Sequence, residues 1–300
     1  MTMQPGRKIA RAARRRAAQL RRASDHLRPA PPIDRIVDDA GTYWAGRDDP
    51  AWESNAHWRS GLGEAHWRTV GAEHLAIFGM FAKALDLPAT PGVVVEWGCG
   101  GGANAVAFAP AADEFVAVDV SGDSVDECVR QVALVCDTAV VPLPVDIREP
   151  ERAADGRENS CDTFICLYVF ELLPSVEDVK RILRIAERML VPGGVAFVQT
   201  KYHTADWRPR AYKRDYAHNL STMTSFGVDE FWSLTTEIGL TPRLATLVPE
   251  NHLDNHYAYY ALTKDARQVG CQGRSRKPCW RMASRSMSEW TSLIRRSSNR

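Results

Sequence analysis

The sequence predicts an α/β fold, a doubly wound and mostly parallel sheet with a helical segment before it. Between residues 92 and 200, short apolar runs typical of strands alternate with runs of helical periodicity. The first of these runs contains three consecutive valines, Val93–Val95, which suit a strand buried on both faces. A glycine-rich turn at 98–102 follows, where the backbone can bend sharply and approach a ligand closely.

The expected elements follow one another in order along the chain. Strands are expected at 92–97, 115–120, 139–145, 162–168 and 195–200, and a closing pair at 243–248 and 256–262. Helices are expected from about residue 102 and at 123–136, 176–190 and 228–238. The segment Val191-Pro-Gly-Gly194 is expected to form a turn that ends the helix before it.

The N-terminal part of the chain has its own composition. Residues 43–87 are rich in Trp and His, and their later part has helical periodicity and ends at Pro88. We therefore expect a helical extension that covers the mouth of the sheet. The expected domain bounds are 1–28 for a basic tail, 29–89 for this extension, 90–264 for the sheet domain and 265–300 for a second basic tail.

Charge is distributed unevenly, although the whole chain carries only +1. Residues 1–28 hold nine Lys/Arg and one acid, and residues 264–300 hold ten Lys/Arg and two acids. Each tail therefore has a net charge of +8, which leaves −15 on the residues between them. The tails are expected to be disordered. Contact with nucleic acid or an anionic membrane is a second interpretation of them, and a targeting segment is a third interpretation of the N-terminal tail.

The cysteines and the apolar runs indicate the compartment. Seven cysteines form no paired pattern, which favours a reducing cytoplasm without a disulfide framework. No run approaches the roughly eighteen apolar residues of a membrane span, so no transmembrane segment is expected. No group of His, Cys and Asp has the spacing of metal ligands, so no metal is expected.

The glycine turn allows two interpretations of its ligand. Gly98, Gly100 and Ala103 fit the fingerprint of a dinucleotide-binding turn, with Asp119 placed to bind a ribose hydroxyl. The other interpretation starts from Glu96, two residues before the first glycine. A pyrophosphate has little use for a carboxylate there, whereas a ligand with a cationic or hydroxylated head could use one.

Further matches in the right order support the second interpretation. They are the acid before three alternating glycines, the acids at 119, 146 and 162, the Pro-Gly-Gly segment and the final strand pair. On these residues the chain resembles the class I S-adenosylmethionine-dependent methyltransferases over roughly 90–263, and it is similar to uncharacterised actinobacterial members. The resemblance implies a seven-stranded Rossmann-like sheet that ends in an antiparallel pair, with S-adenosyl-L-methionine as the cofactor.

The resemblance also implies a set of cofactor-binding residues. Glu96 would interact with the methionine end, Asp119 with the two ribose hydroxyls, and Asp146 with the adenine amino group. The residue after each of these aspartates would flank the adenine, and the end of the fourth strand would face the sulfonium methyl. The full expected set is Glu96, Gly98, Cys99, Gly100, Gly102, Asp119, Val120, Asp146, Ile147, Leu167 and Tyr168.

The chemistry implied by the resemblance is an in-line displacement, in which the protein mainly aligns the acceptor and excludes water. A base is needed only where the acceptor loses a proton in the step. The catalytic candidates are Glu171, Tyr202 and His203, which follow two of the expected strands. The segment Trp207–Arg214 mixes basic and aromatic residues and could hold an anionic group of the acceptor.

The acidic charge between the tails argues against a large nucleic-acid acceptor. We therefore expect a small-molecule acceptor, with O-methylation slightly favoured over C- or N-methylation. The alternatives are a nicotinamide enzyme, a non-catalytic nucleoside-binding module, and a nucleic-acid-associated methyltransferase that uses the basic tails.

Overall fold

The computed structural model describes residues 31–45, 64–204, 216, 223–250 and 255–265. The predicted basic tails, apart from residue 265, and the segment Trp207–Arg214 lie outside these residues. Among the helices that are described, none combines the length and the apolar character needed to cross a membrane.

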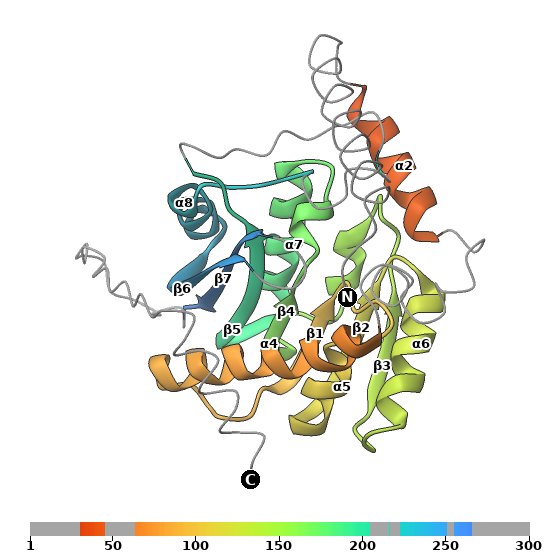
Figure 1. Ribbon diagram of the computed structural model, residues 1–300, viewed down its shortest axis with the longest axis vertical. Helices are drawn as coiled ribbons and strands as arrows, with labels where there is room; N and C mark the ends of the chain where they lie inside the picture. Colours follow the sequence, from red (N-terminus) through yellow and green to blue (C-terminus); the bar gives the residue numbers. More distant parts are fainter. Residues whose placement is uncertain (1–30, 46–63, 205–215, 217–222, 251–254, 266–300) are drawn as a thin grey trace, which may run out of the picture. The chain divides into compact units, whose positions relative to one another are not determined.

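The described strands form one mixed sheet (Figure 1) with the order β3-β2-β1-β4-β5-β7-β6. Strands β1 to β5 pair in parallel, whereas β7 runs antiparallel to both β5 and β6. The strands are β1 (Gly92–Trp97), β2 (Ala112–Asp119), β3 (Val140–Pro144), β4 (Cys161–Cys166), β5 (Leu190–Lys201), β6 (Leu240–Glu250) and β7 (Asn255–Lys264). The predicted sheet with its terminal antiparallel pair is confirmed. The strand order reverses between β1 and β4, and open α/β sheets bind their ligands beside the carboxyl ends of such strands.

Helices cover both faces of the sheet. One face carries α4 (Glu64–Leu85), α5 (Ala105–Phe108) and α6 (Gly122–Ala133), and the other carries α7 (Val176–Met189) and α8 (Val228–Ile238). Strand residues alternate between the faces. Val94 and Phe115 therefore pack with the first group of helices, and Val95 and Val116 with the second. Figure 1 shows α4 running across the strands rather than along them. Short 3-10 turns are η2 (Ala109–Ala111), η3 (Pro150–Ala154) and η4 (Phe170–Leu172).

The structure corrects the expectation of a turn at Val191–Gly194, because this segment lies inside strand β5. Helix α7 ends at Met189, and the next residue already pairs with β4. Between the pairs Cys161–Leu190 and Thr163–Val195, β4 advances by two residues and β5 by five. The additional residues form a bulge in which Gly193 takes a positive φ of 88°. The helix expected from about residue 102 begins only at Ala105, because the glycine turn continues up to it.

Helix α4 approaches the glycine turn closely at Gly71. A Cβ at this position would lie 2.2 Å from the carbonyl oxygen of Ala103 and 3.1 Å from the Cα of Asn104. Both atoms belong to the backbone, so a flexible side chain cannot move aside. Glycine at 71 therefore allows the helix to lie directly against the end of the turn.

We expect Gly71→Ala to destabilise the protein by about 1–3 kcal/mol, because overpacking against backbone outweighs the better helix propensity of alanine. The matched control is Gly79→Ala on the same helix, where a Cβ would meet no atom within 4 Å. This control should stabilise the protein by about 0.5–1 kcal/mol. Urea unfolding of both variants checks the pair, and a stable Gly71→Ala protein would contradict the close approach.

The N-terminal helix α2 (Ile33–Ala45) lies beside two loops of the sheet domain. Its buried residues Ile36 and Ala40 pack in a small cluster with Ile147, which follows β3, and Leu172, which follows β4. Trp44 Nε1 donates a hydrogen bond of 2.9 Å to the hydroxyl of Tyr216. The helix thus contacts both loops at the carboxyl edge of the sheet.

Candidate functional site

The turn after β1 has a backbone that only glycine accommodates well. Gly98, Gly100 and Gly102 have φ values of 74°, 49° and 88°. The amide of Gly98 donates to the carbonyl of Val118 at 2.8 Å, which ties the turn to β2. A Cβ at Gly98 would lie 2.4 Å from Cγ2 of Val169, so the turn and the β4 loop are in direct contact.

Asp119, the last residue of β2, is held beside this turn. Its Oδ2 accepts a hydrogen bond from the amide of Gly100, and its Oδ1 accepts one from the amide of Ser121, both at 2.9 Å. Burial raises the pKa of Asp119, and these backbone hydrogen bonds oppose the rise. Each carboxylate oxygen can accept a second hydrogen bond. The carboxylate is therefore fixed in place with room for two more donors, as two adjacent ribose hydroxyls would supply.

Glu96 is a buried carboxylate in the interior of the site, with 1% of its surface exposed. Its Oε1 accepts a 2.8 Å hydrogen bond from Nδ2 of Asn104. Its Oε2 is buried and makes no hydrogen bond within the described part of the chain. Burial raises the pKa of Glu96 to about 8. A buried carboxyl oxygen of this kind fits a ligand that brings a positive charge or a donor, such as the ammonium group of a methionine.

Cys99 and Gly102 contribute to the turn by packing. Cys99 is buried in the hydrophobic cluster that also contains Cys128, and burial raises the pKa of its thiol well above the usual value. A Cβ at Gly102 would lie 3.1 Å from the Cα of Cys128 in helix α6. The side chain of Cys99 therefore belongs to the core, and only its backbone faces the turn.

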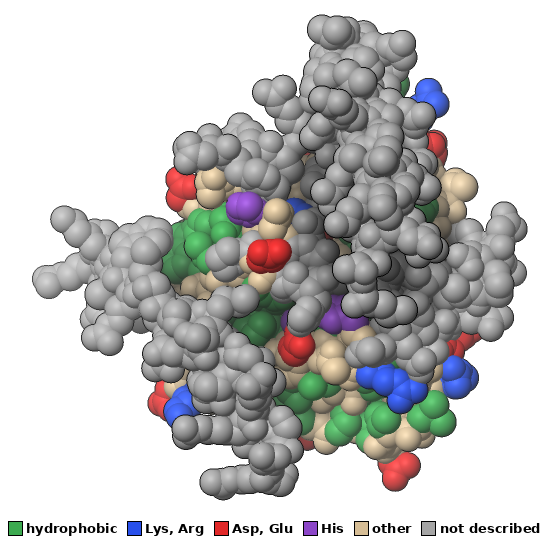
Figure 2. Space-filling model, viewed as in Figure 1, with side chains coloured by type: hydrophobic (Ala, Val, Ile, Leu, Met, Phe, Trp, Pro, Cys, Tyr) green, Lys and Arg blue, Asp and Glu red, His purple; other side chains and the backbone are tan. Residues whose placement is uncertain are grey.

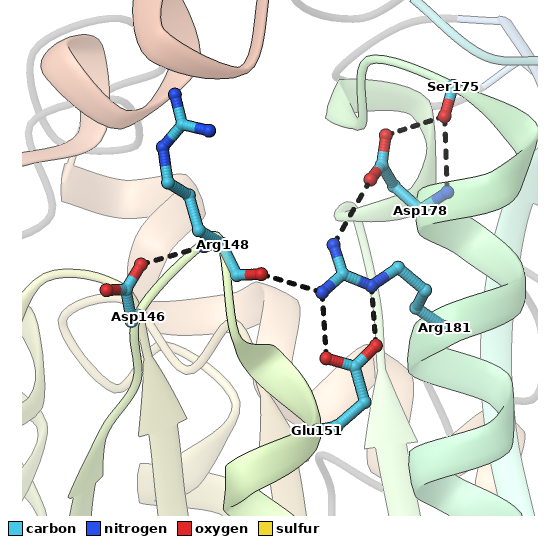
Figure 3. A network of polar contacts seen from close by, with 6 residues as sticks. All are labelled: Asp146, Arg148, Glu151, Ser175, Asp178 and Arg181. Carbon is cyan, nitrogen blue, oxygen red and sulfur yellow. Dashed lines mark hydrogen bonds and ion pairs between the residues drawn. The ribbon is translucent and has the colours of Figure 1, made fainter. Parts of the chain in front are cut away.

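The loop after β3 is clamped by polar contacts (Figure 3). Asp146 Oδ1 accepts a 2.8 Å hydrogen bond from the amide of Arg148. Arg181 of α7 donates to the carbonyl of Arg148 at 2.8 Å and to both carboxylate oxygens of Glu151 at 2.5 and 2.7 Å. The guanidinium of Arg148 pairs with Asp38 of α2. The loop that carries Asp146 and Ile147 is thus held in place by α7 on one side, and α2 contacts it on the other.

Tyr168 is held in an unusual conformation after β4. It has a φ of 56°, which is uncommon for a residue other than glycine and strains a bulky one. Its amide donates a 2.7 Å hydrogen bond to Oε1 of the buried Gln199, and its ring lies edge-on to Tyr257 at 5.0 Å. The preceding Leu167 is buried in the core. Such a strained residue persists only where its surroundings determine it, and such residues cluster at functional sites.

Five further side chains, which the sequence did not predict, also lie here. The hydroxyls of Tyr168 and Tyr259 are 2.9 Å apart, and the Tyr259 hydroxyl lies 3.2 Å from Nε2 of His74. Nδ1 of His74 is 2.7 Å from Oδ1 of Asn104, the residue that contacts Glu96. The buried Lys201 places its Nζ 5.3 Å from the centre of the Tyr257 ring. His74 belongs to the Trp- and His-rich segment, but its spacing gave no sign of a partner 185 residues away.

The three predicted catalytic residues lie in different surroundings. Glu171 is buried in η4, and its carbonyl accepts a 2.9 Å hydrogen bond from Met223. Tyr202 is buried in the cluster on the α7 and α8 face. His203 lies 3.3 Å from the hydroxyl of Ser225 and 3.8 Å from Glu230, and it lines an open hollow of about 640 Å³ at the start of α8. The structure thus groups Tyr202 and His203 with α8, whereas Tyr168 lies on the α4 face.

The strand order, the reversed final pair and the site at the ends of β1 and β2 define a Rossmann-like methyltransferase fold. Two solved structures share it. One is the 1,6-didemethyltoxoflavin N1-methyltransferase of Burkholderia thailandensis, solved with bound 1,6-didemethyltoxoflavin and S-adenosylhomocysteine (TM-score 0.55, 16% identity, 80% of this chain and 93% of that chain). The other is an S-adenosylmethionine-dependent methyltransferase of Leishmania major (TM-score 0.53, 16% identity, 76% of this chain and 83% of that chain). At these identities the likeness shows the fold alone.

The sequence comparison identifies the domain. Residues 95–196 match the family model described as a methyltransferase domain. This part of the chain is therefore a methyltransferase domain, and the proteins of this family use S-adenosylmethionine as their cofactor. No curated protein matches the sequence. The expected similarity to actinobacterial members stays a prediction.

Proposed function

We propose that the protein transfers the methyl group of S-adenosylmethionine to a small-molecule acceptor, with an oxygen atom as the favoured site. The observation that carries the proposal is the buried Glu96. Its Oε2 lacks a hydrogen bond within the described residues, and it lies beside a glycine turn at the reversal of strand order. An ammonium group at this position would bring the donor and the positive charge that the carboxyl group needs.

The remaining cofactor contacts follow from the same geometry. Asp119 would accept hydrogen bonds from the ribose hydroxyls, with Val120 beside it. Asp146 and Ile147 would hold the adenine, on a loop that Arg181 keeps in place. When bound, the cofactor supplies an activated methyl group on a sulfonium. The protein then has to orient the acceptor and exclude water. Helix α2 contacts the adenine side, which supports the N-terminal extension as a cover of the site.

Two features support a small acceptor and an oxygen atom. On the face drawn in Figure 2, acidic and basic side chains of the described residues lie interspersed, and such a surface attracts a polyanion weakly. Tyr168, Tyr257 and Lys201 lie together near the carboxyl ends of β4 and β5. A lysine ammonium near aromatic rings would favour an acceptor with an ionised oxygen or another anionic group.

Binding and transfer assays on the intact chain test the proposal. Calorimetry with S-adenosylhomocysteine should show a Kd on the order of micromolar, about −8 kcal/mol. Tritium from methyl-labelled cofactor should then appear in a low-molecular-weight fraction of a cell extract. Absence of cofactor binding would contradict the methyltransferase proposal. Binding without transfer would indicate a nucleoside-binding module, and label in the nucleic-acid fraction would indicate a role for the basic tails.

A further inference from the structure

A chain of five polar side chains connects the cofactor carboxyl group to the end of β4. It runs from Glu96 through Asn104, His74 and Tyr259 to Tyr168, with successive separations of 2.8, 2.7, 3.2 and 2.9 Å. The residues come from β1, the glycine turn, α4, β7 and the β4 loop. All except Tyr168 are buried. The chain therefore links two ends of the site through the protein interior.

The direction of each hydrogen bond in this chain follows from the orientation of the Asn104 amide, whose nitrogen faces Glu96. The amide nitrogen of Asn104 donates to Glu96, so its carbonyl oxygen faces His74 and requires a proton on Nδ1. Burial lowers the pKa of His74 to about 4, so the imidazole is neutral at physiological pH. With the single proton on Nδ1, Nε2 can only accept a hydrogen bond.

The remaining two hydrogen bonds follow in turn. The Tyr259 hydroxyl has to donate to Nε2 of His74, so towards Tyr168 it offers only its oxygen. Burial raises the pKa of Tyr259 well above its usual value, and the hydroxyl keeps its proton. The Tyr168 hydroxyl must then donate to Tyr259. Its only proton is committed to this bond, so towards a ligand the Tyr168 oxygen can act only as a hydrogen-bond acceptor.

We propose that His74 is a positioning residue that acts through Tyr259 and orients the Tyr168 oxygen to accept a hydrogen bond from the methyl acceptor. This inference rests on the proposed function. It also specifies the substrate class further, because the acceptor must carry an O–H or N–H group near the atom that is methylated. The backbone strain at Tyr168 and its anchors on Gln199 and Tyr257 are consistent with a side chain held for this purpose.

The first test removes one link while it preserves the cofactor pocket. Tyr259→Phe keeps the ring and deletes the hydroxyl, so the transfer rate into the active extract fraction at saturating cofactor should fall about 10-fold. The Kd for S-adenosylhomocysteine should stay within about 2-fold. The deleted hydroxyl is separated from Glu96 by His74 and Asn104, so the contacts of the Glu96 carboxyl group remain intact. The matched control is Tyr260→Phe, the next residue on the same strand. Tyr260 is equally buried but packs on the opposite face of the sheet. The methyl-transfer rate of Tyr260→Phe should therefore equal that of the parent protein.

A second variant separates orientation from packing. His74→Gln offers an amide that can donate to Asn104 and accept from Tyr259, whereas His74→Leu offers neither. We expect His74→Leu to lose most of the methyl-transfer rate and His74→Gln to retain most of it. Equal losses in both variants, with cofactor binding intact, would overturn the positioning role.

A direct measurement of the imidazole needs no acceptor. Nitrogen NMR of histidine-labelled protein, with the His74 signals assigned by their loss in His74→Gln, should show the neutral Nδ1–H form. Tyr259→Phe should shift the Nε2 signal of His74, because this nitrogen loses the hydroxyl that donates to it. An Nε2–H or doubly protonated ring would overturn the inference. Failure of the parent protein to bind S-adenosylhomocysteine would instead overturn the proposed function, so the two failures are distinguishable.

Discussion

Asp119→Asn is expected to weaken the binding of S-adenosylhomocysteine by at least about 100-fold. The carboxylate uses one position on each oxygen for Gly100 and Ser121 and would offer the other two to the ribose hydroxyls. An amide replaces one acceptor by a donor and removes the charge. The loss of two charge-assisted hydrogen bonds corresponds to about 3 kcal/mol. Calorimetry on the purified variant measures the change.

The matched control for this prediction is Asp113→Asn. Asp113 lies on the same strand β2 but near its amino end, and its side chain is exposed. Its replacement should leave the affinity unchanged. Equal affinities of Asp119→Asn and the parent protein would contradict the assignment of Asp119 to the ribose.

Glu96→Gln is expected to stabilise the cofactor-free protein while it weakens cofactor binding. The unfolded carboxyl group has a pKa of 4.5, and burial raises the folded value to about 8. Between these values folding requires the uptake of a proton, at a cost of about 1.4 kcal/mol for each pH unit above 4.5. The stability linked to Glu96 is therefore complete below pH 4.5 and is lost as the pH rises towards 8. Glutamine does not titrate, so Glu96→Gln should raise the free energy of unfolding of the cofactor-free protein by about 3 kcal/mol at pH 7.

Urea unfolding at pH 5 and pH 8 checks the sign of this effect. The difference in the free energy of unfolding between Glu96→Gln and the parent protein should be small at pH 5 and large at pH 8. Glu114→Gln, on the neighbouring strand, serves as the control and should show no such growth. Stabilisation by added S-adenosylhomocysteine should be weaker in Glu96→Gln, because the ammonium group loses its carboxylate. A variant that is less stable at pH 8 would show that Glu96 is ionised and satisfied without the cofactor.

The sheet could be predicted from the sequence because its strands are short apolar runs buried on both faces. Val93–Val95 and Phe115–Val118 show this directly, and both lie in the observed strands. The segment Val191–Gly194 could not be predicted in the same way. A Pro-Gly-Gly run is typical of a turn, but its pairing with β4 depends on residues about 30 positions earlier in the chain. Only the tertiary structure reveals that it forms a bulge.

One part of the candidate site could likewise be predicted from the sequence, and the other part could not. Glu96, the glycine turn and Asp119 lie at strand ends within one sequence pattern, and the structure brings them together. His74 and Tyr259 come from a helix and a strand that are far apart in the sequence, and neither belongs to a recognisable pattern. Their polar contacts became evident only through burial and distance. The half of the site that one βα unit supplies can therefore be predicted from the sequence, whereas the half assembled from several elements cannot.

Helix α2 has a consequence for the timing of the reaction. It touches the loop of Asp146 and Ile147 through a few apolar residues and through the pair Asp38–Arg148, whose side chains are 61% and 51% exposed. An exposed ion pair adds little stability, and one short helix detaches far more easily than the sheet unfolds. Under the proposed placement of the cofactor, detachment of this helix would loosen the loop that holds the adenine. Substitutions at Asp38 would then act on the release of the spent cofactor without altering any atom near the methyl group.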